Sequence, residues 1–231
     1  MILIEGPDLV GKTTLANVLK GHLQLEYDHF GKETEAYSVL DYFARIRPNT
    51  ICDRMAISKM VYGGTFNDQR LMTAGELRSI VSMISAVGGV VVIVAPRHQE
   101  DMAWYRDRLM ATYKDEDELY DPEQNIKVAE AYMDLSQNVV WRESRAEQIL
   151  GDRLIRVRFS EKTGYPAGRE DVLNQIGEKW TEAQDSTWST DPRDESMIRD
   201  RQRMRIQLSL MLNAIVAMRP LVLSHLSGGD L

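Results

Sequence analysis

An α/β fold with a central parallel sheet and helices on both faces is the architecture that this sequence predicts. Short apolar runs alternate with longer helix-forming segments from the first residue to about residue 178. The run Val90–Val94 has five β-branched residues and no polar face, so we expect it inside a sheet that helices cover on both sides. Strands that alternate with helices join through right-handed crossovers, which gives a doubly wound, three-layer arrangement.

The individual elements follow from the periodicity of apolar residues and from turn residues between them. The predicted strands are Ile2–Glu5, Leu23–His29, Thr50–Asp53, Val90–Val94 and Arg153–Phe159. The predicted helices are Thr13–Leu23, Glu35–Arg45, Thr73–Val87, Glu100–Thr112, Glu123–Leu135 and Arg169–Ile176. One helix start is marked by Thr73 and Glu76, which have the spacing of a capping box.

The C-terminal quarter of the chain has a different composition. Trp180–Asp194 is rich in Ser, Thr and Asp, which is typical of a linker, and Ser196–Leu226 predicts a helix-rich tail broken at Pro220. We therefore expect a first domain over residues 1–178 and, over 179–231, a linker with a helical C-terminal extension. The extension would pack on the first domain or form the contact of a homodimer.

Composition limits the classes of function. The chain has 35 acidic and 28 basic residues, so contact with nucleic acid would need a local basic patch. Its single cysteine, Cys52, excludes a disulfide framework within the chain and a multi-cysteine zinc site. The apolar runs are too short or too interrupted to span a bilayer, and the first residues do not form a signal peptide. We expect no membrane contact and a cytoplasmic location, in the host cytoplasm if a phage encodes the chain.

The first predicted strand leads into Gly6-Pro7-Asp8-Leu9-Val10-Gly11-Lys12-Thr13, which matches the P-loop pattern G-x-x-x-x-G-K-[ST]. In such a loop, backbone N–H groups and the positive end of the following helix hold phosphate oxygens. Gly6 and Gly11 let the backbone approach the phosphates closely. Lys12 reaches the β- and γ-phosphates, and the Thr13 hydroxyl ligates Mg²⁺. The motif predicts a site for a nucleoside triphosphate with Mg²⁺ and a phosphotransferase reaction.

A second pair of charged residues, Asp53 and Arg54, ends the third predicted strand. Ligands of open α/β sheets bind at the carboxyl ends of the strands, so both side chains are expected in the crevice that holds the P-loop. Asp53 would hold Mg²⁺ directly or through water. Arg54 would offer a planar fork of donors to the phosphate of an acceptor.

Two segments that contain these motifs, Glu5–Thr14 and Asp53–Gly64, resemble the thymidylate kinase family and the deoxynucleotide kinase-like proteins of bacteriophages. The first has an acidic residue inside the loop, and the second has Asp-Arg followed by Ser and Tyr-x-Gly. His29-Phe30-Gly31 and the segment Ile126–Leu135 are similar to further parts of that family. The resemblance covers about residues 1–178, and the tail has no counterpart in it.

The resemblance implies an ATP- and Mg²⁺-dependent kinase that converts a deoxynucleoside monophosphate, thymidylate-like, into its diphosphate. On that basis Asp8 would touch the acceptor sugar or help to place its phosphate, and Arg54 would bind the acceptor phosphate. Tyr62 would lie near the acceptor, and Thr14 would bind the nucleotide together with the rest of the loop. Structural alternatives are a polar loop residue for Asp8 and a packing aromatic for Tyr62.

The family also closes a lid with arginines over the triphosphate, and Arg106 and Arg108 fall in the corresponding stretch. A charged, solvated helix face is the alternative for both. This chain lacks the family's Arg-Gly and Asp-Arg spacing in the lid and has the acidic region Lys114–Asp121 in its place.

Two other acceptors and one other class of function are alternatives to a monophosphate kinase. Asp28, near the end of the second predicted strand, would be a base for a deoxynucleoside hydroxyl. His29 would contact a phosphate or simply close the strand. A hydroxymethylpyrimidine in modified phage DNA is another acceptor, for which the alternating arginines from Arg199 to Arg205 are weak support. The remaining alternative is a P-loop ATPase that acts on a protein partner.

Overall fold

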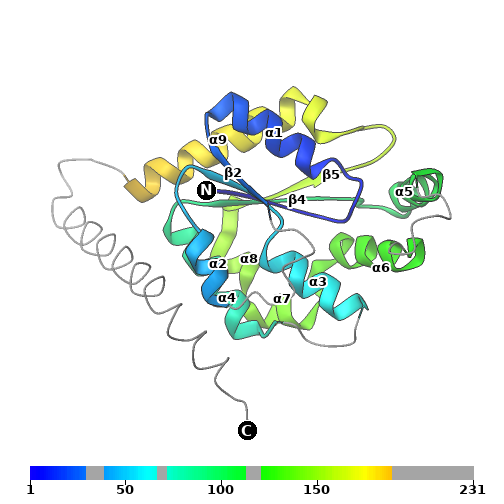
Figure 1. Cartoon of the computed structure of the whole chain (residues 1–231), viewed down its shortest axis with the longest axis horizontal. Coiled ribbons are helices and arrows are strands. Elements are labelled where there is room, and N and C mark those ends of the chain that lie inside the picture. The colour runs from blue at the N-terminus through cyan, green and yellow to red at the C-terminus, as the bar shows by residue number, and fades with distance from the viewer. Residues whose placement is uncertain (30–38, 67–71, 113–120, 189–231) are drawn as a thin grey trace, which may run out of the picture.

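The structure is a computed structural model, and it describes residues 1–29, 39–66, 72–112 and 121–188. Its centre is a five-stranded sheet with strand order β2-β3-β1-β4-β5 (Figure 1). The strands are β1 (Ile2–Glu5), β2 (Glu26–His29), β3 (Thr50–Asp53), β4 (Val90–Ala95) and β5 (Leu154–Arg158). All four pairs of neighbouring strands are parallel, so every carboxyl end lies at the same edge. The predicted α/β fold with a parallel sheet is confirmed.

Helices cover both faces of the sheet and complete the three layers typical of P-loop proteins. Figure 1 shows α1 and α9 on one face and α2, α3, α4, α7 and α8 on the other. The helices are α1 (Lys12–Leu23), α2 (Val39–Arg45), α3 (Ala56–Phe66), α4 (Ala74–Ala86), α5 (Gln99–Thr112), α6 (Pro122–Met133), α7 (Val139–Ser144), α8 (Ala146–Leu150) and α9 (Glu170–Trp188). Short 3₁₀ turns lie at Leu135–Gln137, Gly151–Arg153 and Pro166–Gly168. In the described parts of the chain, we find no helix with the length and apolar content of a membrane span.

Alternation along the strands decides which polar side chains meet. In β1, Ile2 and Ile4 pack in the core with α1, whereas Leu3 packs in the core with α3 and α4. Because successive residues of a strand point to opposite faces, Glu5 follows Leu3 and turns toward α3 and α6. Asp53 turns the other way, toward the first turn of α1.

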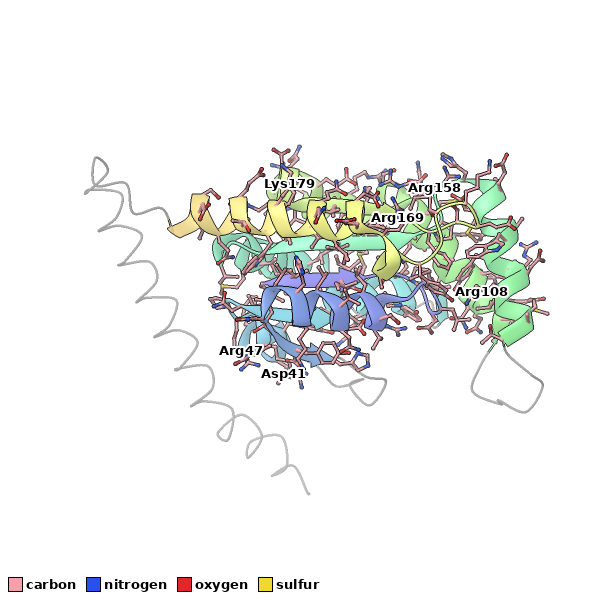
Figure 2. All side chains as sticks on the ribbon, turned by 90° about the horizontal axis from the view of Figure 1, so that it is seen from above. Asp41, Arg47, Arg108, Arg158, Arg169 and Lys179 are labelled. Carbon is pink, nitrogen blue, oxygen red and sulfur yellow. The ribbon has the colours of Figure 1, made fainter. Side chains whose placement is uncertain are left out.

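The two edges of the sheet carry different charged residues. Figure 2 shows Arg158, Arg169 and Lys179 along one edge of the molecule and Asp41 and Arg47 at the other. The first edge belongs to β5 and the elements after it, and the second to β2 and its neighbours.

The structure corrects several predicted elements. The linker predicted from Trp180 is wrong as far as residue 188, because α9 continues to Trp188. Ala183 is buried in the core, and the Gln184 side-chain amide donates to the Gly88 carbonyl oxygen over 2.6 Å, so packing on the domain keeps this polar segment helical. Helix α3 was not predicted, and neither were α7 and α8. Residues 189–231, and with them the expected tail, lie outside the described residues, so the division into two domains stays a prediction.

Candidate functional site

The loop between β1 and α1 needs both of its glycines. A Cβ atom on Gly6 would lie 2.1 Å from the carbonyl oxygen of Val94 in β4, so no side chain fits there. Gly11 has a φ of 80°, and its Cβ would lie 2.6 Å from a ring carbon of Tyr165. Leu9 also has a positive φ, 61°, which is uncommon for a residue with a side chain. The backbone of the predicted P-loop is therefore wound tightly between β4 and the turn that contains Tyr165.

Helix α1 presents an open N-terminus to this loop. Its N-cap residue is Gly11, and no side chain from the described residues caps the first turn or places an acid in it. The first four N–H groups of a helix lack partners within the helix, and the dipole gives that end a partial positive charge. This end of α1 is suited to an anion with several oxygens, such as a phosphate.

Lys12 is the first residue of α1, and its side chain is buried beside the loop. Its ammonium group donates a short hydrogen bond to the carbonyl oxygen of Pro7. Burial lowers the pKa of Lys12 to about 8, and the negative charges of Asp53 and Glu5 only partly offset that effect. An anion bound in the loop would supply a negative charge that stabilises the buried ammonium.

Four side chains from three elements meet at the carboxyl end of β3. The Thr13 hydroxyl donates to Asp53 Oδ2 over 2.5 Å, and the Tyr27 hydroxyl donates to the same oxygen over 3.3 Å. His29 Nδ1 lies 3.5 Å from it. Burial, followed by the charge of Asp53, raises the pKa of Tyr27 to about 12. The structure thus brings together Thr13, Asp53 and His29, and it adds Tyr27, which the sequence analysis missed.

The second oxygen of Asp53 is the atom that points to a metal. Asp53 is fully buried, and its Oδ1 has no hydrogen-bond partner among the described residues. A buried carboxylate oxygen without a partner is costly, and a cation removes that cost. The described residues contain no cluster of three or more His, Cys, Asp or Glu side chains, but Mg²⁺ needs only one or two protein oxygens beside water and phosphates. The Thr13 and Asp53 oxygens are of the kind that Mg²⁺ prefers.

Arg54 bridges this cluster to the loop. Its guanidinium group makes an ion pair with the Asp8 carboxylate and lies 5.4 Å from the centre of the Tyr62 ring. The residue itself has a φ of 68°, and its backbone N–H donates to the Ile4 carbonyl oxygen over 2.9 Å. The three predicted acceptor-side residues, Asp8, Arg54 and Tyr62, therefore lie together beside the loop. Their roles stay predictions.

Glu5 forms a buried network that sequence reasoning did not assign. Its carboxylate accepts the Met55 N–H over 2.9 Å, the Tyr132 hydroxyl over 3.1 Å and a short hydrogen bond from Ser58. Burial raises the pKa of Glu5 above its ordinary value, although these hydrogen bonds oppose the shift. The network ties the residue before the P-loop to the start of α3, next to Arg54, and to α6. An acidic residue that ends a buried strand was the available hint.

An aromatic group closes the other side of the loop. Tyr165 packs its ring against Phe159, with centroids 5.4 Å apart, and the Arg108 guanidinium lies 4.6 Å from the Tyr165 ring centre. Arg108 also lies over Trp104, whereas Arg106 is exposed on α5. A cavity of about 510 Å³ opens here, large enough for a nucleobase. It is lined by Leu9, Gly11, Thr14, Val18, Tyr165, Ala167 and Gly168.

Asp28 is kept apart from this cluster. It faces the opposite side of β2 from Tyr27 and His29, because side chains alternate along a strand. Its Oδ1 lies 3.1 Å from Arg45, and its Oδ2 lies 3.9 Å from Arg47. Both carboxylate oxygens thus face cations, which is an environment for an ion pair and a poor one for a proton acceptor.

Comparisons with known proteins agree with this geometry at the level of the fold. No family model matches the chain. A stretch of 105 residues is 30% identical to the SPbeta prophage-derived uncharacterized protein YorR of Bacillus subtilis (strain 168), which covers 41% of this chain and 61% of that protein. The crystal structure of YorR in complex with phosphorylated GDP matches with a TM-score of 0.52 and 20% identity, over 80% of this chain and 96% of that one. The match spans less than two thirds of the curated relative, so the comparisons show a shared fold.

The Glu5 network leads to a prediction about stability and pH. Because the folded-state pKa of Glu5 is raised, the native protein holds this proton more tightly than the unfolded chain does. The contribution of Glu5 to stability is therefore largest below its unfolded pKa of about 4.5 and is lost as the pH rises through the folded pKa. Glu5→Gln removes this loss. Urea unfolding at a series of pH values should show that wild type loses stability relative to Glu5→Gln as the pH rises above about 4.5. A constant difference would contradict the assignment.

Proposed function

We propose that this chain transfers the γ-phosphoryl group of Mg²⁺–ATP to a deoxynucleoside monophosphate, thymidylate-like, and releases ADP and the deoxynucleoside diphosphate. The observation that carries the proposal is the contact of Thr13 with Asp53 over 2.5 Å, with the second Asp53 oxygen unpartnered, beside the buried Lys12 and the open end of α1. A helix terminus, a cation and metal-binding oxygens around one loop are the parts that phosphoryl transfer needs.

On the donor side, the loop and the first turn of α1 would hold the β- and γ-phosphates through backbone N–H groups. Lys12 would exchange its contact with Pro7 for phosphate oxygens, since both lie along the same loop. Mg²⁺, held by Thr13 and Asp53, would supply positive charge to the phosphates. The adenine ring of ATP would enter the cavity between α1 and Tyr165. The exposed ring of Tyr165 is a stacking surface next to Arg108.

On the acceptor side, Arg54 would leave or share its ion pair with Asp8 when a monophosphate arrives. Asp8 would then be free to contact the sugar. The acceptor phosphate oxygen forms the new bond to the γ-phosphorus, the bond from that phosphorus to the bridging oxygen of ADP breaks, and no proton must be removed. Alignment and charge neutralisation are therefore what this site must provide.

The position of Asp28 favours a phosphate acceptor over a hydroxyl acceptor. A deoxynucleoside hydroxyl gains from a nearby carboxylate base, but Asp28 is held between Arg45 and Arg47 on the other face of β2. The complex of YorR with phosphorylated GDP is further support for a nucleotide ligand, and it makes a guanine nucleotide worth including among the acceptors. Transfer to modified DNA, the homodimer and a partner-dependent ATPase have no observation in their favour among the described residues.

A product screen tests the proposal directly. The protein is incubated with Mg²⁺, ATP labelled at the γ-phosphate and panels of nucleosides, deoxynucleoside monophosphates and duplex DNA with hydroxymethylpyrimidines. We expect label in a deoxynucleoside diphosphate. Label in a nucleoside monophosphate or in DNA would replace the proposed acceptor, and release of inorganic phosphate alone would overturn the kinase assignment.

Lys12→Ala should lower phosphoryl transfer at least about 100-fold, because a buried cation aimed at developing charge is lost. Circular dichroism should show an unchanged fold, since this residue begins a helix and alanine is a strong helix former. Transfer at the wild-type rate would mean that the loop does not hold the donor.

Lys12 should also take up a proton when nucleotide binds. At a pH slightly above its pKa of about 8, part of the protein has neutral Lys12, and polyphosphate binding raises that pKa. Calorimetry with a non-hydrolysable ATP analogue in buffers of different ionisation enthalpy should detect the uptake, with affinity falling as the pH rises through about 8. Lys12→Arg stays charged and should bind without this uptake. Equal proton exchange in both proteins would exclude Lys12 as its source.

Two substitutions distinguish the kinds of acceptor. Arg54→Ala should lower kcat/KM for a monophosphate by roughly 10- to 100-fold, because a charged hydrogen-bond donor to phosphate is lost, and should leave any activity on nucleosides unchanged. Asp28→Asn should change the rate less than about fivefold, as expected for a structural ion pair. A severe effect of Asp28→Asn with a mild effect of Arg54→Ala would indicate a hydroxyl acceptor instead.

A further inference from the structure

Three arginines, Arg97, Arg156 and Arg158, gather at the carboxyl end of β4 and along β5. Two of them have carboxylate partners: Arg158 holds Asp101 through two hydrogen bonds of 2.9 and 2.8 Å, and Arg156 makes a short ion pair with Glu147. The third, Arg97, donates to the carbonyl oxygen of Arg156 over 2.5 Å and has no carboxylate partner among the described residues. The group therefore keeps one positive charge that no acid of the described residues neutralises.

Arg97 is an exposed residue whose cationic neighbours act on its guanidinium group. Desolvation, followed by the charges of Arg156 and Arg158, lowers the pKa of Arg97. Its backbone N–H and that of His98 are both used, because they donate to Asp101 Oδ2 over 3.0 and 3.2 Å. The guanidinium of Arg97 and the imidazole of His98 also carry N–H groups that line the adjacent cavity.

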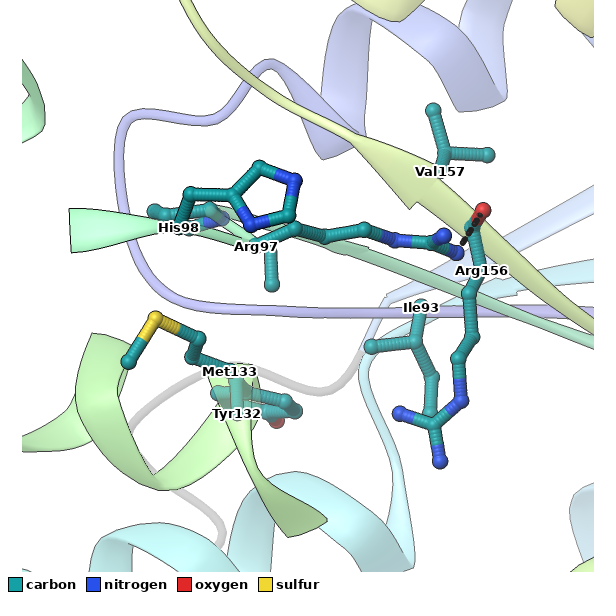
Figure 3. A pocket seen from close by; sticks show the side chains of 9 residues that line it. Ile93, Arg97, His98, Tyr132, Met133, Arg156 and Val157 are labelled. Carbon is teal, nitrogen blue, oxygen red and sulfur yellow. Dashed lines mark hydrogen bonds between the residues drawn. The ribbon is translucent and has the colours of Figure 1, made fainter. Parts of the chain in front are cut away.

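A cavity of about 220 Å³ lies directly beside these groups. In Figure 3 the Arg97 side chain runs over it to Arg156, with His98 above and Tyr132 and Met133 on α6 below. Apolar side chains from both strands, Ile93 and Val157 among them, form part of its wall. Pockets for drug-sized ligands have volumes of about 300–1,000 Å³, so this one is too small for a whole nucleotide. A cationic rim over an apolar wall is suited to a small anion with an organic part.

We propose that this pocket, between Arg97, Arg156 and His98, is a binding site for a small organic anion, a phosphate ester or a carboxylate. The Arg97 fork would hold two oxygens of the anion in the bidentate manner that guanidinium groups favour. Arg156 would add a second cation. Its guanidinium pairs with the Glu147 carboxylate and still has further N–H donors for the anion. The proposal does not depend on the kinase assignment.

The pocket and the P-loop share one residue. Tyr132 lines the pocket, and its hydroxyl donates to Glu5 Oε2 over 3.1 Å, directly before the P-loop. An anion beside Arg97 would therefore lie one side chain away from the Glu5 network. This contact gives the site a physical connection to the loop through which occupancy of one can alter the other.

An NMR titration of the full chain tests the site. Inorganic phosphate, glycerol phosphate and acetate are added at constant ionic strength, and the arginine Nε–Hε signals are followed. The Lys12→Ala background removes the loop lysine, so that the P-loop does not compete for phosphate. We expect saturable shifts of the Arg97 and Arg156 signals, with glycerol phosphate or acetate showing which chemical class is preferred. Shifts that grow without saturation for all three probes would overturn the proposal.

Variants locate the effect. Arg97→Gln should weaken binding about tenfold or more, because the charged fork is lost, and Arg97→Lys should fall between this variant and wild type. Arg142→Gln changes an exposed arginine of α7 and should leave the affinity unchanged. Equal weakening by Arg97→Gln and Arg142→Gln would mean general charge attraction and no site.

Crystals grown with selenate give an independent answer. The anomalous signal of selenium should appear beside Arg97 as well as at the N-terminus of α1. A signal at α1 alone would contradict the anion site and leave the P-loop assignment intact. A signal beside Arg97 alone would support the anion site and contradict the P-loop assignment.

Discussion

The contact between Thr13 and Asp53 is the interaction on which the rest of the site depends. It joins the first turn of α1 to the carboxyl end of β3 and fixes one oxygen of a fully buried carboxylate. Tyr27 and His29 hold the same oxygen from β2. The other oxygen has no hydrogen-bond partner among the described residues. The parallel sheet also brings Arg54 and Lys12 to this edge, because all the strands end there.

Charge balance is the physical basis of the proposal that this arrangement binds a polyphosphate with a cation. Lys12 is buried, and burial lowers its pKa although the charges of Asp53 and Glu5 oppose the shift. Glu5 is satisfied by three hydrogen bonds, whereas Asp53 keeps an oxygen without a partner among the described residues. Buried charges that lack partners cost several kcal/mol each, so both groups would gain from a ligand of opposite charge. In the proposed function, a metal at Asp53 and phosphates at Lys12 would offset these costs together.

The sequence predicted the parts of this structure that local chemistry determines. The tight loop before α1 followed from the spacing of Gly6 and Gly11, the sheet from β-branched runs such as Val90–Val94, and the start of α4 from the Thr73 capping box, which is present. What it did not predict depends on contacts between distant residues. Glu5 contacts Tyr132, 127 positions away, and no local sequence pattern predicts that contact. The predicted helix ended at Ile176, well before the end of α9, because the polar composition that follows is typical of a linker. In the structure, packing on β4 stabilises the rest of this helix.

The central claim is that Asp53 and Thr13 hold a metal beside a triphosphate in the P-loop. The most direct measurement is a crystal structure with a non-hydrolysable ATP analogue in which Mn²⁺ replaces Mg²⁺, because manganese gives an anomalous signal. The account predicts one manganese peak within coordination distance of the Thr13 hydroxyl and on the side of Asp53 Oδ1, with phosphates at the N-terminus of α1. Triphosphate and manganese bound elsewhere, with the loop empty, would contradict it.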